Sequence, residues 1–147
     1  MRIHNYTSFP IETLKEIVAF VKPNYLRIKN RRLRVDLVTY SCLAKRLPDC
    51  VKNGIGGVAG WHNHSHGEYV IVAIPRRGNH QMSFAGMLVK NDIEWLVFIF
   101  AHEFQHIKQF RLGYISGVAV DGLEKDADAR ARVVLKKWRK THAKKNK

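Results

Sequence analysis

Cysteine is scarce in this sequence, which has only Cys42 and Cys50 among its 147 residues. The two do not form a Cys-x-x-Cys pair, and nothing else in the chain marks it as a disulfide-rich secreted protein. We therefore expect both side chains to be reduced, partly buried thiols rather than halves of a structural disulfide.

Long apolar runs are also absent. The most apolar stretch, Trp95–Ala101, is far too short to span a bilayer, and Met1–Pro10 lacks the apolar segment and cleavage site of a secretory signal. Hydrophobic residues still make up 46% of the chain, which is enough for a real core at this length. We expect one soluble, cytoplasmic domain over residues 1–140 with no membrane partner, followed by a basic, disordered tail at 141–147.

Acidic residues are few, because 12 Asp and Glu stand against 26 Lys and Arg, for a formal net charge of +14. The final segment, Arg130–Lys147, contains nine Lys or Arg and no acid, whereas seven of the twelve acids lie between Asp92 and Asp128. A basic C-terminal segment can bind nucleic acid or an acidic partner, or it can simply be a solvated tail. The sequence leaves both interpretations open.

Hydrophobic periodicity and turn residues predict a mixed order of helices and strands. Helices are expected at Phe9–Lys22 with Ser8 as the N-cap and at Leu123–Lys140. A third is expected between an N-cap at Asn91 or Asp92 and a stop at Gly113. Strands are expected at Leu33–Tyr40 and Glu68–Pro75, with a turn and short strand at Asn53–Gly60 and a loop or short helix at Arg76–Lys90. The segment Cys42–Pro48 is ambiguous.

The stretch Ile93–Phe110 contains the pattern His-Glu-x-x-His, formed by His102, Glu103 and His106. Its apolar residues recur at helical spacing, so the pattern lies on a helix packed into a core. Residues four apart on a helix share a face, and the two histidines can therefore direct their imidazoles at one ion. Glu103 is close enough to reach a water molecule there, which is the arrangement that zinc-dependent hydrolysis needs.

A third ligand is required, because catalytic zinc sites use three protein ligands. Glu124 follows His106 by eighteen residues, and Glu124 and Asp128 lie four apart on one face of the next helix. Glu124 is the expected ligand, with Asp121 as the alternative, and Asp128 is expected to accept the outer N–H of a ligand histidine. Asp126 faces away from Glu124 and is expected to be exposed to solvent.

With His-Glu-x-x-His followed by Glu-x-x-Ala-Asp, the chain resembles the gluzincin metallopeptidases, and most of all their compact ImmA/IrrE-type and minigluzincin-like members. The resemblance covers Glu68–Val134. It implies an α+β, zincin-like fold in which a small, mostly antiparallel sheet packs on the motif helix and on the glutamate-bearing helix that follows. It also implies one zinc per chain, held by His102, His106 and Glu124, and Glu103 as the general base.

The same resemblance makes Glu68–Pro75 the edge strand along which a peptide substrate would lie. Two features depart from the family pattern: Ile107–Phe110 lacks the small or leucine-rich sequence common in the ImmA-like group, and the basic C-terminus is not part of the signature. The sequence therefore predicts a zinc peptidase. The alternative is a zincin-fold module that binds nucleic acid or protein and has little or no peptidase activity.

Several other polar residues are candidates by residue type alone. An oxyanion formed during peptide hydrolysis needs a hydrogen-bond donor besides the metal, for which the sequence offers Tyr114, His80 and Tyr69. Three histidines also alternate at the tip of an expected hairpin, where they could hold a second metal ion: His62, His64 and His66.

Overall fold

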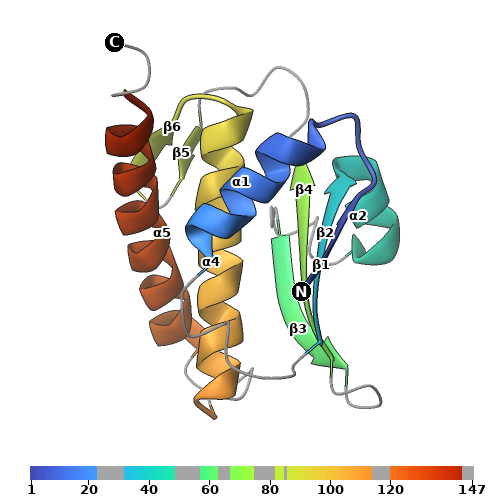
Figure 1. Ribbon diagram of the computed structural model, residues 1–147. Helices are drawn as coiled ribbons and strands as arrows, with labels where there is room; N and C mark the ends of the chain where they lie inside the picture. The colour runs from blue at the N-terminus through green and yellow to red at the C-terminus, as the bar shows by residue number, and fades with distance from the viewer. Residues whose placement is uncertain are drawn as a thin grey trace.

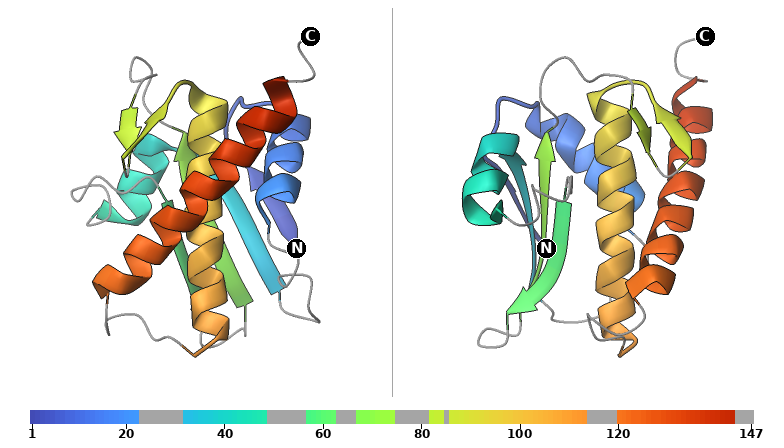
Figure 2. Two further views of the ribbon diagram at one scale, coloured as in Figure 1. Left: turned by 90° about the vertical axis from the view of Figure 1, so that its left-hand side faces the viewer. Right: turned by 180° about the vertical axis from the view of Figure 1, so that it is seen from behind.

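The computed structural model describes residues 1–22, 32–48, 57–62, 67–74, 82–84, 86–113 and 120–143. In chain order its elements are β1 (Arg2–Asn5), α1 (Ile11–Val21), β2 (Arg32–Thr39), α2 (Tyr40–Arg46), β3 (Gly57–His62), β4 (Gly67–Ile74), β5 (Met82–Phe84), β6 (Met87–Val89), α4 (Asp92–Arg111) and α5 (Val120–Ala143). These elements form layers (Figure 1, Figure 2). Helices α1 and α4 cover one face of the main sheet, α2 covers the other, and α5 lies on the outer side of α4.

Helix α4 is the centre of the fold. It begins after Asn91, whose side chain accepts a hydrogen bond from the Glu94 backbone N–H at 2.9 Å, and it ends before Gly113, which has a positive φ of 90°. The predicted helix and both of its ends are confirmed. Because α4 lies between the sheet and α5, apolar side chains are buried around most of its circumference: Leu96, Val97, Phe98, Ile99, Phe100, Phe104 and Ile107.

The main sheet has the strand order β1-β2-β4-β3, and two of its three pairings are parallel. The expectation of a mostly antiparallel sheet is therefore wrong. The cause lies in the connections, because a crossover through a helix brings the next strand back in the same direction. Helix α1 makes such a crossover between β1 and β2, and the sequence does not predict β1, which has only four residues.

The prediction that Glu68–Pro75 forms an edge strand is also wrong. Strand β4 lies inside the sheet between β2 and β3, so Glu68–Pro75 is not the edge that the family resemblance implies. The edge position belongs to β3, which pairs with β4 in an antiparallel hairpin whose register runs from Gly57 opposite Val72 to His62 opposite Gly67.

Two local predictions need correction, and the structure assigns one segment that the sequence leaves open. Helix α1 begins after Pro10, which occupies the N-cap position with a φ of −59° and no side-chain cap, so Ser8 is not the N-cap. The ambiguous segment Cys42–Pro48 belongs largely to α2, which starts after the capping residue Thr39. The expected loop or short helix at Arg76–Lys90 instead contains the antiparallel pair β5 and β6.

Helix α5 is tied to α4 through a buried carboxylate. Arg139 Nε donates to Glu94 Oε1 at 2.9 Å and Arg139 Nη2 donates to Glu94 Oε2 at 2.6 Å. Burial raises the pKa of Glu94, but the bonds from Arg139 and from the Lys90 backbone N–H outweigh burial, and the net pKa is lowered. The helix continues to Ala143, three residues beyond the predicted domain end, and residues 144–147 lie outside the described part of the chain.

Two composition-based expectations can be compared with this structure. Cys42 is a free, partly buried thiol, whereas Cys50 lies outside the described residues. Across the parts of the chain that the structure describes, no helix has both the length and the apolar character needed to cross a membrane.

Candidate metal centre

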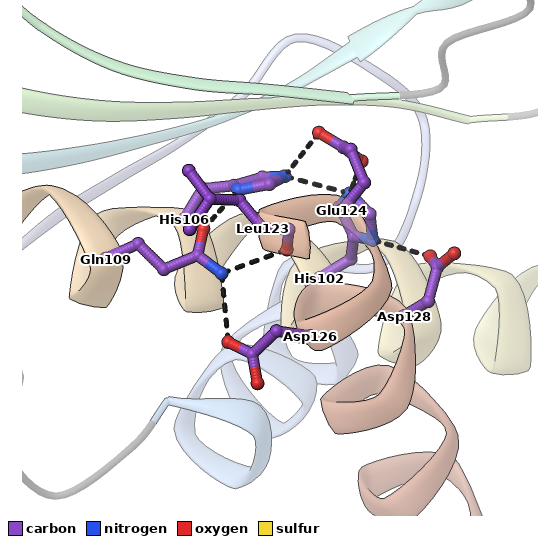
Figure 3. A network of polar contacts seen from close by, with 7 residues as sticks. All are labelled: His102, His106, Gln109, Leu123, Glu124, Asp126 and Asp128. Atoms are coloured by element: carbon purple, nitrogen blue, oxygen red, sulfur yellow. Dashed lines mark hydrogen bonds and ion pairs between the residues drawn. The ribbon is translucent and has the colours of Figure 1, made fainter. Parts of the chain in front are cut away.

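The two motif histidines lie one turn apart on α4 and face each other. The Nε2 atoms of His102 and His106 are 3.0 Å apart, and their rings meet edge to face with centroids 4.7 Å apart. Figure 3 shows both rings next to Glu124, which extends from the neighbouring helix α5. The four-residue spacing seen in the sequence thus brings two imidazole nitrogens to one point.

Glu124 brings a carboxylate to the same point. Its Oε2 lies 3.2 Å from His102 Nε2, and its Oε1 lies 3.2 Å from His106 Nε2. One potential ligand atom from each of the three residues lies within 4.8 Å of the others. The Glu124 side chain is 49% exposed, so the cluster is open to solvent on the side of α5.

Hydrogen bonds on the far side of each ring determine which nitrogen carries the proton. His102 Nδ1 lies 2.9 Å from the Asp128 carboxylate, and a carboxylate can only accept, so Nδ1 is the protonated nitrogen. His106 Nδ1 lies 2.7 Å from Gln109 Oε1 and donates to it in the same way. Asp128 therefore has the position expected from the sequence, and both Nε2 atoms present lone pairs to the centre.

Gln109 also contacts this cluster, and the sequence does not single it out. Its Nε2 donates to the Leu123 carbonyl at 3.0 Å and to the Asp126 carboxylate at 2.9 Å. Both partners can only accept, which fixes the orientation of the amide and leaves Oε1 facing His106. Because Leu123 directly precedes Glu124, one amide links His106 to the backbone beside Glu124. The only signal in the sequence is the i, i+3 spacing of Gln109 from His106.

Asp126 is exposed, as expected, but its carboxylate also takes part in this network. It accepts a hydrogen bond from Gln105 Nε2 at 2.7 Å in addition to the bond from Gln109. These two bonds lower the pKa of Asp126, against the opposing effect of its partial burial. Two glutamines of α4 thus hold one acid of α5, which fixes the position of the first turns of α5 relative to the histidines.

The residues fit a zinc ion. Two imidazole lone pairs that face each other at 3.0 Å beside a carboxylate repel one another unless a proton or a metal cation lies among them. Burial and the neighbouring His106 lower the pKa of His102 despite the nearby Glu124 and Asp128, and a neutral imidazole is the form that binds metal. Two histidines and one glutamate are also the ligand set of a well-known class of catalytic zinc sites.

The side chain of Glu103 lies against the edge strand β3. It is buried, and the Ala59 backbone N–H of β3 donates a hydrogen bond to it. Burial and the nearby Glu124 raise the pKa of Glu103 to about 8, although the bond from Ala59 lowers it. A cation beside the carboxyl group favours its ionised form.

Gly57 is the residue that lets β3 come this close to α4. A Cβ atom at this position would lie 3.0 Å from both Cγ and Oε1 of Glu103 and 2.8 Å from Ile99 Cγ2. The contact with Ile99 is shorter than real Cβ atoms make, and those with Glu103 are tighter than most, so a larger residue at this position would displace these side chains or the strand. The glycine at the start of β3 therefore allows the edge strand to lie directly against Glu103.

Tyr69, a candidate for oxyanion stabilisation, lies away from the centre. Side chains alternate along β4, and Val70 and Val72 pack in the core with α4, so Tyr69 faces the opposite side of the sheet. There it lines a hollow with Arg34 and Asp36. The remaining candidates cannot be placed, because they lie outside the described residues or have side chains that are not described: His80, Tyr114, His62, His64, His66 and Asp121.

Comparison of the sequence with models of known protein families gives no match, and comparison with curated proteins gives none either. The likeness to gluzincins therefore depends on the two spaced motifs alone. We base the functional proposal on the chemistry of the cluster formed by His102, His106 and Glu124.

Replacing Gln109 by methionine is expected to weaken zinc binding by about 10-fold or more while the protein stays folded. Methionine has a similar length, but its sulfur is only a weak acceptor for the hydrogen bond from His106 Nδ1, and it cannot donate to the Leu123 carbonyl. Both His106 and the backbone beside Glu124 would lose their support. Zinc affinity is measured by competition with a chromophoric chelator, and folding by circular dichroism.

Gln105→Met is the matched control. Like Gln109, Gln105 donates a hydrogen bond to Asp126. It does not bind either histidine Nδ1, because these atoms bond to Asp128 and Gln109. The control should stay much closer to wild-type zinc affinity. If Gln109→Met binds zinc as tightly as the wild type, the amide does not position His106.

Proposed function

We propose that this protein is a zinc-dependent peptidase that hydrolyses peptide bonds in proteins or peptides. The observation that carries the proposal is the convergence of His102 Nε2, His106 Nε2 and the Glu124 carboxylate on one point. These three groups would hold one zinc ion per chain. Three protein ligands leave a coordination position open for water or substrate, which distinguishes catalytic from structural zinc sites.

A zincin-like fold of the gluzincin type is part of the proposal. Its support is the arrangement around α4, which carries the motif and packs beside a sheet whose edge strand β3 runs antiparallel to its neighbour. The helix that follows, α5, supplies both Glu124 and Asp128 to the cluster.

Glu103 is the group to which we assign proton transfer. When bound, zinc polarises a peptide carbonyl and lowers the pKa of a water molecule. Glu103 adjoins His102 in the sequence and is buried beside the cluster, where it would accept the proton of the attacking water and pass it to the leaving amine. The bond from Ala59 orients the carboxylate, and β3 shields it from bulk solvent.

The free edge of β3 suits an extended peptide as substrate. Among the described strands β3 pairs only with β4, so its outer edge presents backbone groups to which a peptide can add as a further strand. The same strand contacts Glu103 through Gly57 and Ala59. A peptide bound along this edge would therefore pass close to the proposed base.

Cleavage of a disordered substrate tests this proposal. Zinc-loaded protein is expected to cleave casein or a mixed peptide library, a chelator should abolish the cleavage, and added zinc should restore it. Peptide products are followed by mass spectrometry, which detects narrow as well as broad specificity. Cleavage that persists after complete removal of the metal, or a zinc-loaded protein that cuts nothing in the library, would count against a peptidase.

A further inference from the structure

The outward side of α5 carries a row of basic residues that the metal centre does not use. From Ala129 to the end of the helix at Ala143 the sequence contains no acid. Figure 2 shows α5 running across the outside of the molecule, on the side of α4 away from the sheet. Three lysines on this side are exposed and two arginines are partly exposed: Lys136, Lys137, Lys140, Arg130 and Arg132.

Helical spacing places most of these cations on one strip. Arg132, Lys136 and Lys140 are separated by four residues each, so they align along the helix and span about 12 Å at 1.5 Å per residue. The opposite side of the same turns is apolar and packs into the core through Ala131 and Leu135. We refer to Arg132, Lys136, Lys137 and Lys140 as the basic strip.

The lysines of this strip are not engaged within the protein. Arg139, at its flank, is bound to Glu94 and holds α5 on α4. Lys136, Lys137 and Lys140, in contrast, make no ion pair with any residue that the structure describes. Three unpaired ammonium groups on neighbouring turns of a rigid helix create a positive surface whose field reaches into solvent, and the chain as a whole has a net charge of +14.

We propose that the basic strip binds the phosphate backbone of double-stranded nucleic acid. Lysines on a rigid surface bind phosphates by displacing condensed counterions, with no requirement for a base sequence. Single-strand binders stack bases on exposed aromatic rings, but Trp138, the aromatic residue of α5, is 6% exposed and stacked on His142. Membrane-surface helices insert their apolar side, which in α5 is buried against the core.

The strip and the metal centre are on the same helix but well separated. Along the helix axis, at 1.5 Å per residue, Arg132 lies about 12 Å from Glu124 and Lys136 lies about 18 Å from it. A duplex on the strip would therefore leave the cluster of His102, His106 and Glu124 accessible, and a peptidase could act on proteins that are held on nucleic acid. The binding itself does not rest on the proposed peptidase activity, because none of the strip residues contributes to the zinc site.

Fluorescence anisotropy with a short labelled DNA duplex tests the proposal. The wild type should bind at low salt and lose affinity steeply toward physiological salt. In the triple variant Lys136→Gln, Lys137→Gln, Lys140→Gln, three phosphate contacts are lost. Affinity at low salt should fall by about 10-fold or more, and the slope of log K against log salt should become shallower by about two to three.

Two control variants distinguish an effect of the basic strip from an effect of the protein's net charge. Arg2→Gln, Lys15→Gln, Lys45→Gln lowers the net charge by the same amount at exposed positions on β1, α1 and α2, and it should bind nearly as the wild type does. The three strip lysines changed to arginine keep the charge and should also keep the affinity. Melting curves establish that all variants are folded.

Three results would overturn the proposal. The first is no duplex binding at low salt, and the second is equal weakening by the strip variant and its charge-matched control. The third is tighter binding to anionic phospholipid vesicles or to polyglutamate than to the duplex, which would make a membrane or an acidic protein the partner. Zinc-free protein should bind the duplex as well as zinc-loaded protein does, so failure of the peptidase proposal would not affect this test.

Discussion

Replacing Glu103 by glutamine is expected to leave the zinc and the fold in place and to reduce peptide hydrolysis by about 10²-fold or more, the usual contribution of a general base. Glutamine keeps the shape of the side chain and can accept the hydrogen bond from Ala59, but it cannot take a proton from water at neutral pH. Glu103 is not among the three converging groups, so zinc binding should not depend on it. Initial rates are normalised to zinc content.

Glu12→Gln provides the matched control for this variant. It makes the same chemical change at an exposed position of α1, and it should retain the full rate of hydrolysis. If Glu103→Gln cleaves as fast as the wild type, the activity does not come from this site. The helix α4 would then be a metal-holding or purely structural element.

Zinc is expected to raise the melting temperature of the wild type, and the loss of one ligand should abolish this rise. An ion that binds only the folded state stabilises it by about 2.7 kcal/mol at 100 times its Kd. For a domain of this size that corresponds to roughly 5–10 °C. His106→Ala and Glu124→Ala should show no comparable shift when zinc is added, as measured by differential scanning calorimetry with and without a chelator.

His142→Ala is the control for the ligand variants. His142 is also a histidine, but it stacks on Trp138 and lies 3.3 Å from Glu16, at the end of α5 far from the cluster. Its loss should lower the melting temperature with and without zinc by a similar amount, so the zinc-dependent shift should remain. A full zinc-dependent shift in His106→Ala would remove His106 from the ligand set.

The geometry of the site could be anticipated because helix geometry is local. Four-residue spacing puts His102 and His106 on one face whatever the rest of the fold does, and it aligns Glu124 with Asp128 in the same way. The contact between the two helices is not local, but both have an apolar side to bury, and their packing brings Asp128 to the outer nitrogen of His102.

The hydrogen bonds that Gln109 makes to His106 and to the start of α5 could not be anticipated from the sequence. Gln109 is one of several polar residues on α4, and its partners depend on how α5 crosses that helix. The crossing brings Asp126 and the Leu123 carbonyl to the same amide. Helical spacing predicts only that Asp126 faces away from Glu124, which is compatible with its hydrogen bonds to Gln105 and Gln109.

The strand order and strand directions of the sheet could not be predicted either, because they also depend on contacts between distant parts of the chain. The alternating residues of β2 and β4 predict strands, but the direction in which strands pair depends on the connections between them, and β1 is too short to stand out. The edge strand begins in the glycine-rich stretch Asn53–Gly60, which predicts a turn and a short strand but does not indicate that this strand is at the edge of the sheet. The close approach of Gly57 to Glu103 is visible only in the folded structure.

The zinc content of the purified protein tests the central claim most directly. We predict one zinc per chain in the wild type after incubation with excess zinc and removal of free metal, and the same content in Glu103→Gln. We predict much less in His106→Ala and in Glu124→Ala, because each variant removes one of the three groups that converge on the ion. A wild type without zinc, or full retention of zinc in either ligand variant, would contradict the assignment of the metal centre.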